Sequence, residues 1–524
     1  MVGVPTMHDR KIEILNCTSR LRTNTTSGYR NLLDSVPSLT PSKSAQSREF
    51  ARRQGSLRTA IFDGSYVTDG DKIKVLTIAP PIQIYHPIFQ EFRDVVKSDS
   101  PLDPTIVDGV SKMVSDMGKI RIEKEGAASL REHLAKILGT RVEQVVTESR
   151  YADGLVSMEG RLNTIPMIVV EYKRSLGDGS CDPLVQASYS TLNYWTDSKV
   201  RYFLIHLEFC IVTHTQAAPI RDRCCCPTFI VAGSGAYLAI LGVVFTDRLI
   251  VQKLTDLMWC GEATVYDDSR VYHLARVFTA LSFTRKSMEK YYTELVQLEP
   301  QPPPPTRPSP HPRFFPYPTQ FKEGASTTEF RYIQPFSDGS TNVTFLAETI
   351  HGSGPSRKLV IKFVDRYGVG PHRLLADEEM APKLLFCGRL DGSTEDEGQT
   401  DDPSSGLYLG PVRMVVMEWI DGETAAKTKK DAWPESARER VKEALTKLHK
   451  MGLVFGDLRG PNIMFQRNTN RVLLIDFDWS GQAGVVHYPR HLSKQVKWPE
   501  GVDDGKEITM EHDLAMLEEL FGAR

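Results

Sequence analysis

Apolar and polar residues follow different periods along the middle of the chain. Residues 125–138 place apolar side chains at helical spacing and predict an amphipathic helix. Residues 142–157 and 165–175 have strand-like patterns, the second with an Ile-Val-Val run, and residues 182–195 predict another helix. The order helix–strand–strand–helix predicts a mixed α/β domain.

A second pattern is the uncharged stretch of residues 228–246, which is long enough to cross a bilayer of about 30 Å. The sequence Gly233-Ser234-Gly235 divides it into two short β-branched and aromatic runs, and an Asp-Arg pair flanks each end. We therefore predict a buried β-hairpin and no membrane partner, with a transmembrane segment as the alternative.

Proline marks the main domain boundary. Ten of the nineteen residues in 300–318 are proline, which predicts an extended linker, with a ligand for an SH3-type partner as the alternative. Residues 1–58 are rich in serine and threonine and hold ten Lys/Arg against four acids, which predicts a disordered basic tail. The predicted folded domains are then residues 59–299 and 319–524.

Composition narrows the class of protein. Hydrophobic residues make up 40% of the 524 residues and charged residues 25%, which excludes a wholly disordered or polytopic membrane protein. The net charge of −2 gives no general attraction to nucleic acid, and eight cysteines without a CxxC pair fit neither a disulfide framework nor a zinc site. No apolar segment follows Met1, so we expect an intracellular protein, in the cytoplasm or nucleus.

The C-terminal domain contains residues suited to phosphate chemistry. Asp457 precedes Asn462 by five positions in a Gly/Pro-containing turn, and Asp476 follows at the end of an apolar, strand-like run. Phosphoryl transfer needs a carboxylate to orient the attacking hydroxyl, and an amide oxygen with a second carboxylate to hold Mg²⁺. Upstream, Lys362 lies in a strand-like alternation that would direct its ammonium toward the phosphates of a nucleotide.

The same domain has a candidate adenine cleft. Residues 412–421 form an apolar run that ends in an acidic turn, and Met417, Glu418 and Trp419 are its candidate nucleotide contacts. A turn over the phosphates is expected at residues 336–343, where the only glycine is Gly339.

The segments VFGDLRGPNI and LLIDFDWSG resemble the protein-kinase-like fold, and most closely the fungal-type protein kinase and Crinkler-type family. The resemblance covers about residues 320–524 and implies a bilobal domain that uses ATP and Mg²⁺ on a protein substrate, of the Ser/Thr type. It implies Lys362 as the phosphate lysine, Asp457 as the catalytic aspartate, and Asn462 and Asp476 as the magnesium ligands.

The sequence departs from that family in several places. Phe455 stands where the family has a histidine, so the bracing of the catalytic loop must differ. Glu378 and Glu379 fall late in the helix that should supply a partner for Lys362, and no partner is assigned. Residues 511–513 are interpreted as the polar start of a terminal helix.

The central domain carries a second cluster of candidate residues. Asp153 stands near the end of one predicted strand, and Glu171 and Lys173 share a face of the next. Two carboxylates and a lysine suit Mg²⁺-assisted hydrolysis of a phosphodiester, with Asp153 and Glu171 as metal ligands and Lys173 as the catalytic lysine. A surface ion pair is the alternative.

This pattern resembles the PD-(D/E)xK nuclease superfamily, which implies a restriction-endonuclease-like fold and nucleic acid as a partner. Gln186 and Glu125 stand where that fold often adds active-site residues. Crinkler-type proteins often join such a domain to a kinase.

Three functions follow as hypotheses. The leading one is an ATP- and Mg²⁺-dependent protein kinase fused to a nuclease-like domain. The first alternative is a metal-dependent nuclease regulated by a degenerate, nucleotide-binding kinase domain, and the second is a non-catalytic interaction protein. The oligomeric state stays open.

Overall fold

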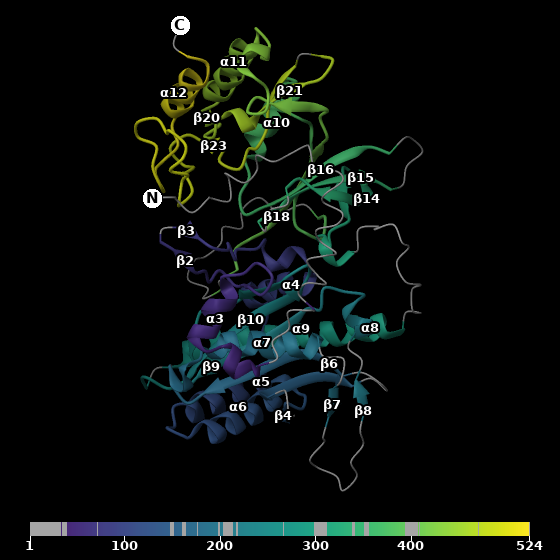
Figure 1. The fold of residues 1–524 in the computed structure, drawn as a ribbon, viewed down its shortest axis with the longest axis vertical. Helices are drawn as coiled ribbons and strands as arrows, with labels where there is room; N and C mark the ends of the chain where they lie inside the picture. Colours follow the sequence, from purple (N-terminus) through teal and green to yellow (C-terminus); the bar gives the residue numbers. More distant parts are fainter. Residues whose placement is uncertain are drawn as a thin grey trace.

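The computed structural model describes Leu33 and residues 39–522, with gaps at 71, 147–150, 160–163, 176, 197–199, 203–212, 216–217, 266, 298–311, 338–340, 351–355, 394–406, 408 and 470. The chain forms a mixed α/β, multidomain structure in which the C-terminal domain lies above the central domain in Figure 1.

The central domain is built on an eight-stranded sheet. Seven strands follow the order β1-β11-β10-β9-β6-β5-β4, and β12 pairs with β10. The pairs β5–β6 and β9–β10 are antiparallel, whereas β6 and β9 are parallel and are joined by a connection that contains α7. The strands are β1 (Ile61–Phe62), β4 (Glu143–Val146), β5 (Tyr151–Glu159), β6 (Thr164–Lys173), β9 (Thr228–Ser234), β10 (Tyr237–Phe245), β11 (Leu249–Lys253) and β12 (Met258–Trp259).

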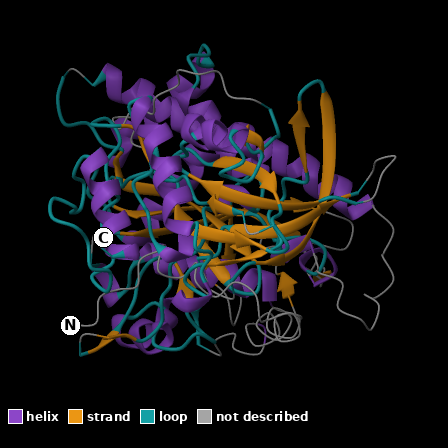
Figure 2. Ribbon diagram, turned by 90° about the horizontal axis from the view of Figure 1, so that it is seen from above, coloured by secondary structure: helices purple, strands orange, loops and turns teal. Residues whose placement is uncertain are grey.

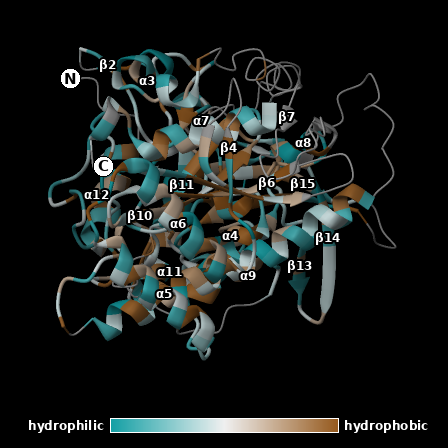
Figure 3. Cartoon of the chain, turned by 90° about the horizontal axis from the view of Figure 1, so that it is seen from below, coloured by the Kyte–Doolittle hydropathy of each residue, from teal (hydrophilic) through white to brown (hydrophobic). Residues whose placement is uncertain are grey.

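Helices cover this sheet and complete one large apolar core. Helix α7 packs on β6 and β9, α6 packs on β5 and β6, and α4 and α5 pack on the long α9. Viewed from above, the strands run through the middle with helices around them (Figure 2), and the view from below shows apolar residues gathered toward the middle of the molecule (Figure 3). The helices are α4 (Pro87–Lys97), α5 (Pro104–Met117), α6 (Glu123–Leu138), α7 (Pro183–Thr196), α8 (Ala218–Arg221) and α9 (Asp268–Gln297).

The hairpin prediction for residues 228–246 is confirmed. Strands β9 and β10 pair around a tight turn, and nearly all of their residues are buried. Gly235 adopts a φ of 56°, and a Cβ at Gly233 would lie 1.8 Å from the carbonyl oxygen of Tyr237, so the turn requires both glycines. No helix in the described residues is long and apolar enough to span a membrane.

Other predictions for this region need correction. The strand expected over 142–157 is two strands, β4 and β5. Asp153 is the third residue of β5, near its start rather than its end. Part of the predicted disordered tail is helical, at α2 (Pro41–Ser44) and α3 (Ser47–Gln54). The buried side-chain amide of Gln54 donates to the carbonyl of Ile61 and accepts from its backbone amide, which anchors the end of α3 on β1.

The C-terminal domain has a six-stranded sheet and a mainly helical part, and in Figure 1 the sheet lies between the helical part and the central domain. The sheet has the strand order β13-β14-β15-β16-β18-β17. These are β13 (Gln320–Glu323), β14 (Ser326–Pro335), β15 (Thr344–Thr349), β16 (Lys358–Val364), β17 (Leu384–Gly388) and β18 (Arg413–Glu418). The rest comprises α10 (Val369–Asp377), α11 (Ala437–Lys450), α12 (Met510–Phe521), the sheet β19 (Gly422–Thr424), β21 (Ile463–Gln466) and β22 (Val472–Leu474), and the pair β20 (Leu453–Val454) and β23 (Gly481–Gln482).

The two domains share buried contacts. Ile84 of the central domain is fully buried in the apolar cluster of the six-stranded sheet, and its carbonyl accepts a 2.8 Å hydrogen bond from the amide of Tyr317. Arg389 pairs with Asp94 at 2.6 Å. Residues 300–311 of the predicted linker lie outside the described residues, but the guanidinium of Arg313 is buried and bonds the carbonyl of Cys224, so the end of the linker packs on the central domain.

Candidate functional site

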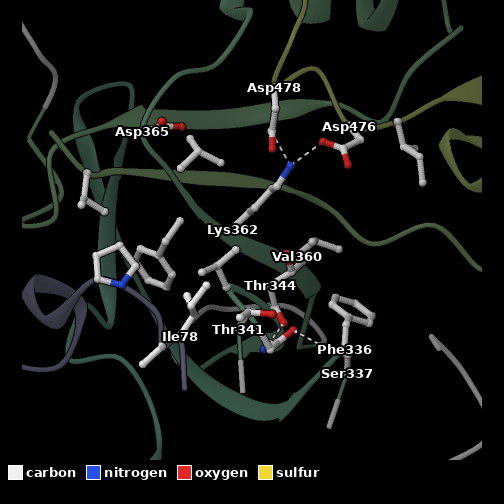
Figure 4. A pocket seen from close by; sticks show the side chains of 18 of the residues that line it. Ile78, Phe336, Ser337, Thr341, Thr344, Val360, Lys362, Asp365, Asp476 and Asp478 are labelled. Atoms are coloured by element: carbon white, nitrogen blue, oxygen red, sulfur yellow. Dashed lines mark hydrogen bonds and ion pairs between the residues drawn. The ribbon is translucent and has the colours of Figure 1, made fainter. Parts of the chain in front are cut away.

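Lys362 is buried at the middle of β16, where it faces two carboxylates. Its Nζ lies 2.5 Å from Oδ1 of Asp476 and also forms an ion pair with Asp478. Figure 4 shows both carboxylates directed at the ammonium. Asp476 was predicted as a metal ligand; Asp478, two residues further on, was not.

The backbone explains why Asp476 points inward. The chain leaves β22, and the amide of Ile475 donates to the carbonyl of Asn462 at 2.9 Å. Asp476 then adopts a φ of 74°, in the left-handed region that costs a non-glycine residue about 1–3 kcal/mol. The following Phe477 is buried, and its ring stacks on His372 at 4.4 Å. Packing of Phe477 holds the strained turn in place.

Asp457 and Asn462 lie together in the preceding loop. Asn462 Nδ2 donates to Oδ2 of Asp457 at 2.8 Å and to its carbonyl oxygen at 2.9 Å. Arg459 donates to both carboxylate oxygens of Asp457, at 2.5 and 3.0 Å. The Arg459 guanidinium also lies 5.1 Å from the ring of Trp498. The carboxylate is therefore held in one orientation from two sides.

Asp513 braces this loop from α12. Its carboxylate is fully buried and accepts hydrogen bonds from the amides of Phe455, at 2.8 Å, and Gly456, at 2.7 Å. His449 Nε2 lies 3.1 Å from the same carboxylate. Asp513 therefore holds the loop through the backbone of Phe455, the position at which the resembled family has a histidine side chain. Sequence reasoning missed this role, because a helix start explained the polar residues at 511–513 equally well.

The two glutamates considered as partners of Lys362 face elsewhere. Glu378 pairs with Lys447 at 3.0 Å, and Glu379 pairs with Arg471 at 2.6 Å. The carboxylates paired with Lys362 in the described residues come from the turn after β22 instead.

Lys362, Asp476 and Asp478 line a cavity of about 830 Å³. Met417, Glu418 and Trp419 from the end of β18 line it too, as does Asn462. The Trp419 ring stacks on Phe336 at a centroid distance of 5.6 Å, and both rings line the part of the cavity that the sequence predicts to contact adenine. Gly339 lies outside the described residues.

The cavity wall is rich in carboxylates. It carries five acidic side chains, Asp63, Asp365, Glu418, Asp476 and Asp478, against three lysines, Lys253, Lys362 and Lys427. A polyphosphate would be repelled unless a cation accompanied it. The carboxylates of Asp476 and Asp478 and the amide of Asn462 offer the oxygen ligands that Mg²⁺ prefers. The described residues contain no group of three or more His, Cys, Asp or Glu suited to a metal ion, so the amide oxygen is needed to complete such a set.

In the central domain, the predicted residues also lie together. Glu171 on β6 accepts hydrogen bonds from Gln186 Nε2 at 2.8 Å and from Ser190 Oγ at 2.6 Å, both on α7. Asp153 on β5 accepts a 2.9 Å hydrogen bond from the amide of Tyr172. Ser190 was not predicted, and only the three-dimensional packing of α7 on β6 identifies it.

The glutamate beside Lys173 is Glu123, which the sequence analysis did not select. Lys173 Nζ lies 2.8 Å from Oε1 of Glu123, the first residue of α6. Glu125 is exposed and lines a separate polar hollow with Asp116 and Arg121. Glu123 and Glu125 are two positions apart on the helix and point to different faces, so Glu125 lies away from Lys173.

Burial dominates the electrostatics of this central site. Asp153, Glu171 and Lys173 are all buried, and Glu171 is completely so. Desolvation raises the pKa of Glu171 well above its ordinary value, and the nearby charge of Asp153 raises it further. Hydrogen bonds from Ser190 and Gln186 and the charge of Lys173 oppose that rise.

No protein-family profile matches the chain, and no curated protein matches it by sequence. Among solved structures the chain is similar to the Cydia pomonella granulovirus kinase PK-1, with 17% identity and a TM-score of 0.23. The match covers 30% of this chain and 53% of the viral kinase, so it spans about half of that protein. A similarity this distant carries no argument about activity, and the function has to be inferred from the site.

Proposed function

We propose that the C-terminal domain is an ATP- and Mg²⁺-dependent phosphotransferase. The observation that carries the proposal is the convergence of Lys362, Asp476 and Asp478 on one cavity, with Asn462 on the same wall. The family resemblance of the surrounding motifs favours a Ser/Thr-type protein kinase, acting on a protein substrate inside the cell.

Each residue then has a distinct role. Lys362 would bind phosphate oxygens, and Met417, Glu418 and Trp419 would contact the adenine. Asp476, Asp478 and Asn462 would hold Mg²⁺, which supplies positive charge to the transferring phosphoryl group. Asp457 would orient the acceptor hydroxyl and accept its proton.

The test is a binding titration and a phosphotransfer assay on the full chain. Lys362→Met should weaken Mg²⁺-ATP binding at least tenfold and abolish transfer. Lys358→Met is the matched control, because Lys358 begins the same strand but is exposed and absent from the cavity wall. A wild-type protein that binds no Mg²⁺-ATP would refute the proposal.

A second candidate function is metal-dependent hydrolysis of a phosphodiester by the central domain. The observation that favours it is the closeness of Asp153 to Glu171, since the charge of Asp153 raises the pKa of Glu171 and a bound divalent cation would offset that repulsion. Lys173→Met should then abolish cleavage of DNA or RNA in Mg²⁺ or Mn²⁺, while Lys136→Met, on the outer part of α6, should not. Full-length protein that cleaves neither nucleic acid would leave this cluster a structural role.

A further inference from the structure

The cavity that contains Lys362 has a wall from the central domain. Phe62 at the end of β1, together with Ile78, Ala79 and Pro81 from the segment that follows, lines the same space as Val360 and Lys362. Figure 4 shows Ile78 on the same side of this space as Thr341. The lining residues of the central domain and those around Lys362 are nearly 300 residues apart in the sequence.

This wall is held firmly within the central domain. The amide of Gly64 donates to the carbonyl of Thr77 at 3.0 Å, which closes the loop after β1. The side chain of Gln252, on β11, accepts from the amide of Ile82 at 2.7 Å and donates to the carbonyl of Pro80 at 2.9 Å. The wall is therefore part of the sheet edge and not a loose loop.

The wall is also anchored to the C-terminal domain. Gln83 Nε2 donates to the carbonyl of Gly410 at 3.0 Å, and the next residue, Ile84, belongs to the core of the six-stranded sheet. Thr255, two residues beyond β11, forms a β-bridge with Leu407. These contacts bracket the wall and fix its position beside the cavity.

From this geometry we propose that the central domain forms part of the nucleotide site, with residues 62–64, 77–79 and 81 enclosing a nucleotide held by Lys362. The inference rests on the proposed function, and extends it by adding a second domain to the site. The wall is apolar at Phe62, Ile78, Ala79 and Pro81, so it offers a nonpolar surface to the nucleotide. Because the nucleotide would touch both domains, its binding would stabilise their contact by linkage.

Ile78→Trp in the full chain tests the inference directly. The Ile78 side chain is 41% exposed, so a larger ring projects into the cavity without overfilling a core. We expect at least tenfold weaker binding of a Mg²⁺ complex of a non-hydrolysable ATP analogue. The matched control is Ile120→Trp, because Ile120 is a fully exposed isoleucine of the same domain outside this cavity and should leave affinity within twofold of wild type.

Hydrogen exchange on the wild-type protein gives a second readout that needs no variant. Bound nucleotide should slow exchange of amides in residues 77–84 as well as around Lys362. Protection confined to the C-terminal domain, or Ile78→Trp binding within twofold of wild type, would overturn the inference while leaving the proposed function intact. If wild-type protein binds no nucleotide, the proposed function fails first, and the inference fails with it.

Discussion

Two clusters of lysine and carboxylates, one in each domain, are built from the same residue types and behave differently. In the C-terminal domain, Lys362 holds two carboxylates that line an open cavity. In the central domain, Glu171 is fully buried against helix α7, and Lys173 pairs with Glu123 at the start of α6. The difference lies in what surrounds the acids.

Neutral donors and burial make the central cluster a closed, polar part of the core. Gln186 and Ser190 satisfy both oxygens of Glu171, yet its pKa is still raised, because desolvation outweighs two hydrogen bonds. In the C-terminal domain the partner of Asp476 is the positively charged ammonium of Lys362, at hydrogen-bond distance, and the carboxylate still lines an open cavity. Residue identity therefore predicts what a cluster can bind, whereas its packing decides whether a ligand can reach it.

The largest expected effect separates catalysis in the two domains. Asp457→Asn should lower phosphotransfer by about 10³-fold, because a neutral amide cannot take the proton from the hydroxyl that attacks the phosphate. Mg²⁺-ATP affinity should stay within threefold, since Asp457 holds no nucleotide. Glu171→Gln, in the other cluster, should leave transfer within twofold. Equal losses from both substitutions in a steady-state assay would show that the clusters act as one site.

A second test concerns the hydrogen bonds from Asp513 to the loop that precedes Asp457. Asp513→Ala should destabilise the C-terminal domain by about 3 kcal/mol, because it leaves the buried amides of Phe455 and Gly456 without an acceptor. Urea unfolding measures the loss. Glu511→Ala, on the exposed side of the same helix start, is the control and should change stability by less than about 0.5 kcal/mol. A change as small for Asp513→Ala would mean that water replaces the carboxylate.

Acid should weaken the C-terminal domain through His372. Burial lowers the pKa of His372 to about 4, below its ordinary value of 6.5. The neutral ring is therefore favoured in the folded state, so this contribution is complete above pH 6.5 and is lost as the pH falls toward 4, at up to about 1.4 kcal/mol per unit. His372→Phe keeps a ring against Phe477 but should remove this slope between pH 4.5 and 6.5. An unchanged slope would assign the acid sensitivity to other groups.

The central cluster should respond to pH in the opposite direction. The raised pKa of Glu171 means that the folded state holds its proton more tightly than the unfolded chain. This contribution to stability is then greatest below the ordinary pKa of 4.5 and declines as the pH rises toward the folded value, by at most about 1.4 kcal/mol per unit. Thermal unfolding of Glu171→Gln should lack this decline. A decline of the same size in Glu171→Gln would contradict the assignment to Glu171.

Some of this organisation could be predicted because it depends on near neighbours. The hairpin at 228–246 follows from a Gly-Ser-Gly break between two apolar runs, and the side-by-side placement of Glu171 and Lys173 follows from the period of a strand. Asp457 and Asn462 meet because a five-residue turn brings them together. In each case the local spacing is sufficient to set the geometry.

What local spacing cannot supply is the partner from a distant segment. Asp513 reaches the loop at Phe455 across 58 residues, and Lys362 reaches Asp476 across 114. Glu123, and not Glu125, faces Lys173 because the docking of α6 on the sheet decides which residues of the helix lie against that lysine. The sequence alone thus predicted candidate site residues and their local turns. Only the tertiary structure decided which groups are paired, which are buried and which wall encloses the cavity, because those outcomes depend on how whole sheets and helices pack against one another.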